Sequence, residues 1–362
     1  MGTTAATADP EKLMAFAGRV SGSAVGAMNC ALTLVGDQLG LYKALASSGP
    51  VNSVALAAKT NLSERWVREW LYHQACNGQI EYVEADDTFL LTPEAEIVLT
   101  NENHAAYMGG LLQTVMALLE TVKDLPESFR TGLGQTYDQK GEACMCGIEK
   151  LTRNLEANHL VPDLLPQVDR VTERLAAGAA VADVGCGAAT STIAMAKAFP
   201  QSKFAAYDIC KYALHRARIN VDRSGVSNIE LYNPIDHPLP QDGSLDLVTT
   251  FDVVHDTTDP KGLIDAIFRS LKPDGIWLCA DIQGKQTFAL NMKENPIAPL
   301  AYGFSLLVCM SSGLSVPEGA GLGTLGFHEQ KAREMSERAG FTKFRNIPFQ
   351  CDVMNVFYEI GK

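Results

Sequence analysis

Apolar residues change their spacing about halfway along the 362-residue chain. From about Glu11 to Leu125 they recur at the three- and four-residue spacing of helices. Beyond Pro166, short apolar runs alternate with helical patterns, which is typical of a doubly wound sheet of parallel strands. The expected strands and helices of this half are, in chain order, Ala180–Val184, Ser191–Phe199, Lys203–Tyr207, Tyr212–Asp222, Ile229–Tyr232, Leu245–Phe251, Lys261–Leu271, Ile276–Ala280, His328–Ala339, Lys343–Phe349 and Asp352–Ile360. The sequence therefore predicts an α/β protein with a mainly helical N-terminal half.

Within the helical half, the pattern predicts a helix-turn-helix followed by a hairpin. Ser53–Lys59 and Glu64–Cys76 are the two helices, and Ser63 is expected as the N-cap of the second. The hairpin is expected between Gln79 and Leu91. This is the winged-helix arrangement, whose second helix enters a DNA groove in many proteins.

The charge of the chain argues against a nucleic-acid partner. The formal net charge is -12, which would repel a phosphate backbone. The second helix also balances Arg65 and Arg68 with two glutamates, so it has no basic face. A packing or dimerisation role is therefore favoured over DNA binding, and we expect a homodimer that forms through the uncharged stretch Val20–Leu34.

Composition also favours a cytoplasmic protein without a membrane span. The uncharged stretches Val20–Gly36 and Ile297–Val316 contain several Gly and Ser residues, so neither is a sustained apolar span. No cleavage site for secretion follows the first stretch. The nine cysteines are an odd number, which favours reduced thiols. Cys144 and Cys146 are the only close pair, so no metal site is expected.

The change of pattern sets the expected domain boundaries. Residues 1–125 are expected to form the winged-helix domain, beginning with an irregular terminus up to about Pro10. Residues 126–170 are expected to be linker and lid helices, and residues 171–362 the sheet domain. Residues 283–325 interrupt the strand and helix alternation and are rich in Gly, Pro and Met, so we expect them to form an inserted lid.

Three strand ends of the sheet domain carry the residues of a nucleoside site. The first strand runs into a tight turn with Gly185 and Gly187, where a ligand can approach the backbone. Thr190 stands at the third glycine of the dinucleotide fingerprint, which disfavours a dehydrogenase. Asp208 ends the second strand and can accept hydrogen bonds from both ribose hydroxyls. Asp236 follows the third strand and can meet the adenine amine, so the sequence indicates an adenosyl ligand.

These motifs resemble those of a known enzyme family. Asp183-Val184-Gly185-Cys186-Gly187, Asp208, Asp236, Asp246-Leu247-Val248 and Leu271-Lys272-Pro273-Asp274-Gly275 look like the successive motifs of class I S-adenosylmethionine-dependent methyltransferases. Residues 56–71 are similar to the winged-helix dimerisation domain of small-molecule O-methyltransferases. The resemblance implies a Rossmann-like sheet, S-adenosylmethionine as cofactor and a small-molecule methyl acceptor.

The resemblance also implies roles for single residues. The methionine end of the cofactor would contact Asp183 and the backbone of the glycine turn, and the ribose would contact Asp208. The remaining contacts to the cofactor are expected from Ile209, Asp236 and Phe251. For Asp183 the sequence leaves an alternative open, in which its carboxylate only caps its own glycine turn.

His255 is the candidate catalytic residue, because it follows the fourth strand at the ligand edge of the sheet. The His255-Asp256 step matches plant-type O-methyltransferases, in which the histidine takes the acceptor proton. In the alternative interpretation, His255 belongs to the turn that caps the helix at Pro260. Because they flank the insertion or the linker, four further residues are candidates for the substrate pocket: Tyr137, His159, Tyr302 and His328.

Three functional accounts remain open from the sequence. The first is an O-methyltransferase that uses His255 as its base. The second is an S- or N-methyltransferase whose acceptor needs little help from a base. The third is a regulator that keeps the fold but binds only DNA or an effector.

Overall fold

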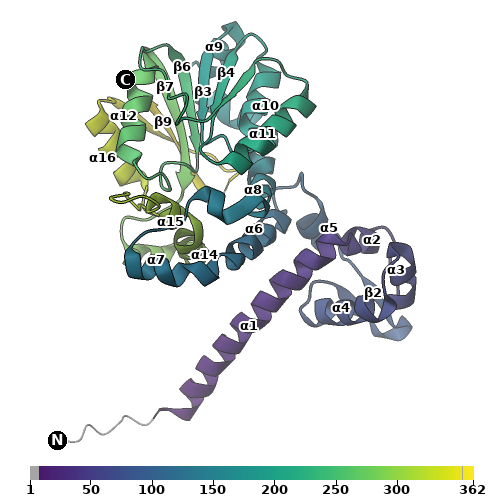
Figure 1. Ribbon diagram of the computed structural model, residues 1–362. Helices are drawn as coiled ribbons and strands as arrows, with labels where there is room; N and C mark the ends of the chain where they lie inside the picture. Colours follow the sequence, from purple (N-terminus) through teal and green to yellow (C-terminus); the bar gives the residue numbers. More distant parts are fainter. Residues whose placement is uncertain (1–7, 353) are drawn as a thin grey trace, which may run out of the picture. The chain divides into compact units, whose positions relative to one another are not determined.

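The computed structural model describes residues 8–352 and 354–362, so residues 1–7 of the expected irregular terminus lie outside the described part. The chain forms two compact units, residues 1–112 and 113–362. Their elements are labelled in Figure 1. The division lies before the boundary expected after residue 125, because Ala117 and Leu118 pack with buried residues from later segments of the second unit, among them Cys144 and Cys210.

The first unit is the expected winged helix preceded by one long helix. Its described elements are α1 (Pro10–Gln38), α2 (Leu41–Ala46), α3 (Ser53–Thr60), α4 (Glu64–Cys76), β1 (Glu81–Val83), η1 (Glu84–Asp86), β2 (Thr88–Leu90) and α5 (Pro93–Thr100). Asn61 lies in the left-handed region at φ 54° and ends α3. Ser63 stands at the N-cap of α4, but its side chain makes no capping hydrogen bond. The buried core of the unit includes Leu56 and Leu71.

The second unit begins with helices that attach to the sheet domain. They are α6 (Gly109–Glu120), which crosses the division, then η2 (Val122–Asp124), α7 (Leu125–Thr131), α8 (Tyr137–Asn154), the π-helix η3 (Leu155–Leu164), η4 (Leu165–Gln167) and α9 (Val171–Ala177). Buried Glu149 of α8 accepts hydrogen bonds from Arg216 Nε, at 2.9 Å, and from Asn220. Both partners lie on α11 (Lys211–Ser224), so α8 belongs to the sheet domain.

The sheet has seven strands in the order β5-β4-β3-β6-β7-β9-β8. Its further elements are β3 (Ala180–Val184), α10 (Thr190–Ala198), β4 (Lys203–Tyr207), β5 (Ile229–Tyr232), β6 (Leu245–Phe251), α12 (Pro260–Ser270), β7 (Leu271–Ile282), α16 (Glu329–Ala339), β8 (Lys343–Ile347) and β9 (Asn355–Gly361). Strand β9 is antiparallel to both of its neighbours, β7 and β8, whereas the other described strand pairs of this sheet are parallel. A short link joins it to β8, whereas a parallel pairing would need a long crossover. The predicted Rossmann-like α/β class is confirmed.

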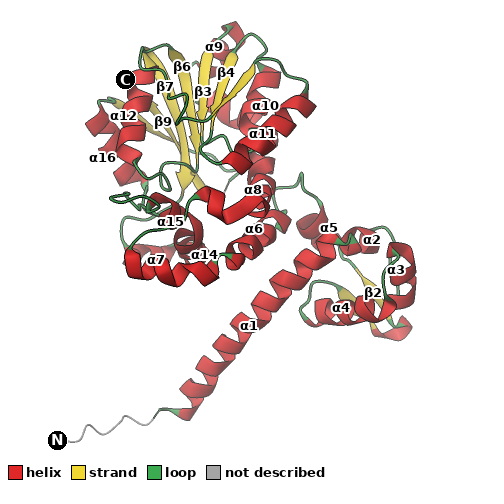
Figure 2. Cartoon of the chain, in the orientation of Figure 1, coloured by secondary structure: helices red, strands yellow, loops and turns green. Residues whose placement is uncertain are grey.

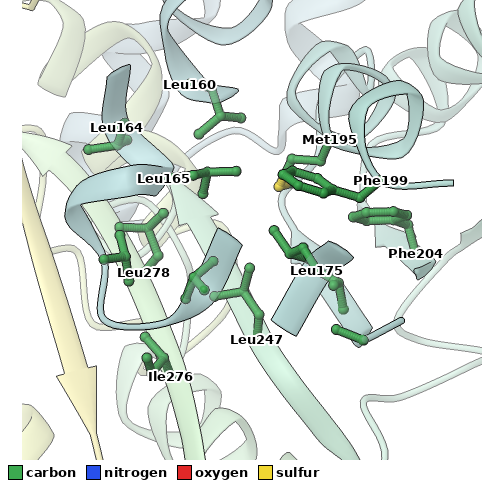
Figure 3. Packing of buried hydrophobic residues seen from close by; sticks show 14 of the residues in the cluster. Leu160, Leu164, Leu165, Leu175, Met195, Phe199, Phe204, Leu247, Ile276 and Leu278 are labelled. Carbon is green, nitrogen blue, oxygen red and sulfur yellow. The ribbon is translucent and has the colours of Figure 1, made fainter. Parts of the chain in front are cut away.

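Alternate residues of each strand face opposite layers of helices, which Figure 2 shows on the two sides of the sheet. Leu247 and Leu278 face η3, α9 and α10, and Figure 3 shows the leucines of this layer around them. Their neighbours Val248 and Cys279 face α12 and α16 instead. Because both faces are covered, the central strands β3, β6 and β7 are largely apolar and buried, which made them recognisable in the sequence.

The insertion is helical and connects to the strand ends. It contains α13 (Phe288–Glu294), α14 (Ala298–Phe304), the π-helix η5 (Ser305–Cys309) and α15 (Met310–Gly313). Its last part hydrogen-bonds to the segment after β6, through Gly323 N to His255 O at 3.0 Å and Ala320 N to Thr258 O at 2.9 Å. The insertion therefore lies at the carboxyl end of β6.

Two further findings concern the whole described chain. All nine cysteines are free thiols. Among the described residues, no helix has both the length and the apolar composition needed to cross a bilayer.

Candidate functional site

The glycine turn after β3 is held by β4 and leaves space for a ligand at one position. Gly185 N and Cys186 N both donate to Tyr207 O, at 2.8 and 2.9 Å. Gly185 has a φ of 70°, and a Cβ there would lie 2.3 Å from Val253 Cγ2. Gly187 also has a positive φ, of 55°, but a Cβ would meet nothing within 4 Å. Gly185 thus packs the turn against the segment after β6, and the backbone at Gly187 is open to an approaching ligand.

Asp208 is tied to this turn from the end of β4. Its carboxylate accepts hydrogen bonds from Gly187 N at 2.9 Å and Cys210 N at 2.8 Å. Burial raises the pKa of Asp208 to about 6, although both hydrogen bonds act in the opposite direction. Each oxygen keeps a further acceptor position for a ribose hydroxyl. The adjacent Ile209 is 60% exposed, and Asp236, after β5, is exposed as well. These side chains therefore lie at one edge of the sheet, as predicted.

Asp183 is buried, and its carboxylate is hydrogen-bonded to other side chains of the protein. Its carboxylate is 1% exposed and accepts hydrogen bonds from three hydroxyl groups, those of Ser191, Thr192 and Thr249. Burial raises the pKa of Asp183, and the hydroxyl groups oppose that effect. These contacts tie the end of β3 to the start of α10 and to β6, and the three donors are side-chain hydroxyls rather than the backbone of the glycine turn named in the alternative interpretation.

His255 is paired with a carboxylate from the next strand. Its Nδ1 lies 2.7 Å from Oδ1 of Asp281, near the end of β7, and both side chains are buried. Burial alone would lower the pKa of His255, but Asp281 and Cys309 outweigh it and raise the pKa well above its usual value. The helix α12 is capped by Asp259, which accepts from Gly262 N at 2.8 Å. The cap therefore does not need His255.

Tyr137 of α8 joins this group from a distant part of the chain. Its hydroxyl donates to Asp256 Oδ2 at 2.6 Å. Burial raises the pKa of Asp256 to about 6, although His255 and Tyr137 favour its charged form. Tyr137 is thus a predicted substrate residue that the fold brings beside His255.

The other three predicted substrate residues have local partners. His159 Nδ1 lies 2.7 Å from Asp163 within η3. The hydroxyl of Tyr302 accepts a hydrogen bond from Nδ2 of Asn291, at 3.4 Å, inside the insertion. His328 accepts from Lys331 N as the N-cap of α16. Phe251, predicted beside the cofactor, packs against the core between the sheet and η3.

Several site residues were not found from the sequence. Asp252 has a φ of 58°, unusual for a residue other than glycine, and Asn355 donates to both of its carboxylate oxygens. Burial and Asp281 raise the pKa of Asp252 to about 7. Glu156 of η3 is electrostatically coupled to Asp183 and Asp252, and burial raises its pKa to about 8. The position of Asp252 and Asp281 after or at the end of a strand was the signal that could have identified them.

Two groups of side chains that share His255 could hold a metal ion by distance alone. One contains Asp256 and Cys309, the other Asp252 and Asp281, with ligand atoms within 4.8 Å of one another. Asp281 already occupies Nδ1 of His255.

Comparison with known families identifies two domains in the chain. Residues 175–340 match the family described as "Methyltransferase domain", and residues 27–101 match the "Rv2258c-like winged HTH domain". Both domains were predicted from the motifs. The predicted cofactor, S-adenosylmethionine, agrees with the match to the methyltransferase domain. A "Ubiquinone biosynthesis O-methyltransferase" of Thiobacillus denitrificans is 33% identical over 100 residues, which are 27% of this chain and 42% of that protein. The chain thus matches less than half the length of this relative.

Solved structures of methyltransferases share the fold. The mitomycin 7-O-methyltransferase MmcR has a TM-score of 0.69 at 18% identity, and the similarity covers 98% of this chain and 100% of that one. Human N-acetylserotonin methyltransferase, solved in complex with S-adenosylmethionine, has a TM-score of 0.64 at 18% identity, with 100% and 99% covered. At these identities the similarity establishes the fold.

Proposed function

Because the chain carries a methyltransferase domain after an Rv2258c-like winged helix-turn-helix domain, we propose that it transfers a methyl group from S-adenosylmethionine to a small-molecule acceptor. The observation that carries the choice of an oxygen acceptor is the buried pair of His255 and Asp281. It lies two residues beyond Val253, which packs against Gly185 of the glycine turn. In this proposal His255 is the proton acceptor next to the cofactor site.

The cofactor site consists of the strand ends around the glycine turn. The open backbone at Gly187 suits close approach of the methionine part, and Asp208 has acceptor positions free for the ribose hydroxyls. Exposed Ile209 offers an apolar surface for the adenine ring, and Asp236 an acceptor for its amine. Asp183 acts in this proposal by holding the turn and the start of α10.

When bound, S-adenosylmethionine supplies an electrophilic methyl group on its sulfonium. Since the reaction is an in-line displacement, the chain has to orient the acceptor, exclude water and remove a proton. Nε2 of His255 takes the proton of the acceptor hydroxyl, and Asp281 stabilises the imidazolium that forms. Residues 126–170 and the insertion 283–325 serve as the lid that excludes water, and Tyr137 helps to line the acceptor pocket.

The winged-helix unit serves dimerisation in this proposal. The large apolar side chains of α1 between residues 13 and 28 are 48–71% exposed, among them Leu13, Phe16, Val20 and Met28. Three helix-interior glycines, at 18, 22 and 26, form a row at four-residue spacing that allows close helix contact, although each weakens an isolated helix. The ion pairs Arg65–Glu69 and Arg68–Glu64 neutralise the basic residues of α4. We therefore propose a cytoplasmic homodimer that does not bind DNA.

The direct test of this function is methyl transfer from cofactor with a labelled methyl group. Purified protein would be incubated with phenol, thiol, amine and carboxylate acceptors, and labelled product would be separated and counted. We expect transfer to a hydroxyl acceptor that is lost in the double variant Asp208→Ala/His255→Gln. Transfer only to thiols or amines, at a rate that His255→Gln does not change, would favour the base-independent methyltransferase instead.

A further inference from the structure

Lys140 of α8 is a buried cation without a carboxylate partner. Its side chain is 4% exposed, and its Nζ donates to Oε1 of Gln135, which is also buried. In the described part of the chain, no carboxylate lies within 4.0 Å of this nitrogen. Burying an unpaired ammonium is costly, so such a group is retained where something pairs with it.

The segment around Lys140 is clamped against the insertion. Gly134 N donates to Leu314 O at 2.9 Å, and Gln135 N donates to Ser311 Oγ at 2.8 Å. A Cβ at Gly134 would lie 1.8 Å from Ser311 O, so only glycine permits this approach. These contacts fix Gln135, and Gln135 in turn orients the ammonium of Lys140.

Lys140 lies in the same helical turn as Tyr137, which contacts the buried group of His255, Asp256, Asp281 and Cys309 (the His255 cluster). Tyr137, three residues earlier and so on the same face of α8, donates to Asp256. Gly141, at φ 80°, breaks the helix immediately after Lys140. Cys309 of η5 interacts electrostatically with both Lys140 and His255, and its Sγ lies within 4.8 Å of ligand atoms of His255 and Asp256. Lys140 is therefore buried on the face of α8 that carries Tyr137, and it interacts with Cys309, which also interacts with His255.

Lys140 keeps its charge at neutral pH. Burial lowers its pKa to about 8, while Cys144, Asp124 and Cys309 act in the opposite direction. At pH 7 the side chain is thus mostly protonated, with two of its three donor positions not used by Gln135.

We propose that Lys140 binds an anionic oxygen of the methyl acceptor, which makes the acceptor a small organic acid with a carboxylate or phenolate group. This inference rests on the proposed function and specifies its substrate class. An anionic group would supply the missing partner of the buried ammonium through a charge-assisted hydrogen bond. The same negative charge would favour binding beside the sulfonium of the cofactor.

The test uses the full-length protein loaded with S-adenosylhomocysteine. Thermal shifts would be titrated with matched probes, namely benzoate, 4-hydroxybenzoate and aliphatic carboxylates against the corresponding amides. We expect the acids to stabilise the wild type at lower concentration than their amides. Lys140→Met should weaken acid binding by about 10- to 100-fold, the range for losing a hydrogen bond to a charged group. Lys123→Met removes an exposed lysine and should keep the wild-type preference.

Two results would overturn the inference. One is a wild type that shows no preference for any acid over its amide, and the other is a Lys140→Met protein that keeps the preference. If the Met variant does not fold, Lys140→Gln and Lys140→Arg replace it in the same titration. Only the Arg variant, which keeps the positive charge, should retain acid binding. Calorimetry with S-adenosylhomocysteine separates the two levels of the argument. If the wild type does not bind it, the proposed function fails, whereas intact binding without acid preference rejects only the role of Lys140.

Discussion

At the scale of single residues, Asp281 determines what His255 can do. Its Oδ1 accepts from His255 Nδ1 and also from Ile282 N at 2.8 Å, so the carboxylate is fixed by its own backbone. Oδ2 of Asp281 is buried and makes no hydrogen bond within the described part of the chain. The carboxylate therefore orients the imidazole, and in the proposed function it leaves Nε2 to take the acceptor proton and stabilises the protonated ring.

The pair predicts a specific pH dependence. Asp281 raises the pKa of His255, so the ring loses its proton, and becomes able to act as a base, at a higher pH than an ordinary histidine. We expect kcat on a hydroxyl acceptor to increase with pH through a range above the ordinary histidine pKa. His255→Gln should lower kcat by about 10²–10⁴-fold, the usual contribution of a positioned base. Asp281→Asn removes the charge, so the rise should move to lower pH.

Asp259→Asn is the matched control for this experiment. It changes a carboxylate in the loop that contains His255, and that carboxylate only caps α12. It should leave the pH profile unchanged. A pH profile of Asp281→Asn that equals the wild-type profile would show that the pair does not set the protonation of the base.

At the scale of elements, the strand ends position the proposed site, and helix α1 offers an exposed apolar surface. The ends of β3, β4 and β6 bring the glycine turn, Asp208 and His255 to one edge because the strands are parallel and in register. Helix α1 is a different case, since residues 10–27 are exposed along its whole circumference. A long helix without tertiary packing is marginal in water, so α1 needs a partner surface.

The exposed apolar surface of α1 predicts an association that a charge would disrupt. The wild type should be a dimer by light scattering, and Phe16→Asp/Val20→Asp should be largely monomeric, because it places two charges in an apolar contact. Lys12→Asp changes the charge of the same helix at a side chain that is 87% exposed and should remain dimeric. A monomeric wild type, or a dimeric double variant, would contradict the role of α1.

At the scale of the whole molecule, the sequence predicted the elements better than the contacts between them. β3, β4, β5 and β6 begin and end as expected, because strands covered on both faces are continuous apolar runs bounded by turns. The two domains and the residues of the glycine turn were likewise accessible, since both depend on local pattern.

The features that the sequence did not predict depend on contacts between segments that are far apart in the chain. Asp281 meets His255 only because Phe251 and Ala280 are partners in the parallel register of β6 and β7. Lys140 is oriented by Gln135, which lies just before α8 and is fixed by Ser311 of α15, far along the chain. No local pattern contains such pairings, which is also why the expected boundary after residue 125 differs from the division at residue 112.

The most direct test of the central claim is a calorimetric titration of the purified protein with S-adenosylhomocysteine, with NAD as the comparison. We predict binding of S-adenosylhomocysteine at micromolar affinity and none of NAD. Asp208→Ala should weaken that binding by about 1.5–3 kcal/mol, the range for hydrogen bonds to a charged group. No heat with millimolar S-adenosylhomocysteine, or binding of NAD in its place, would contradict the assignment as a methyltransferase.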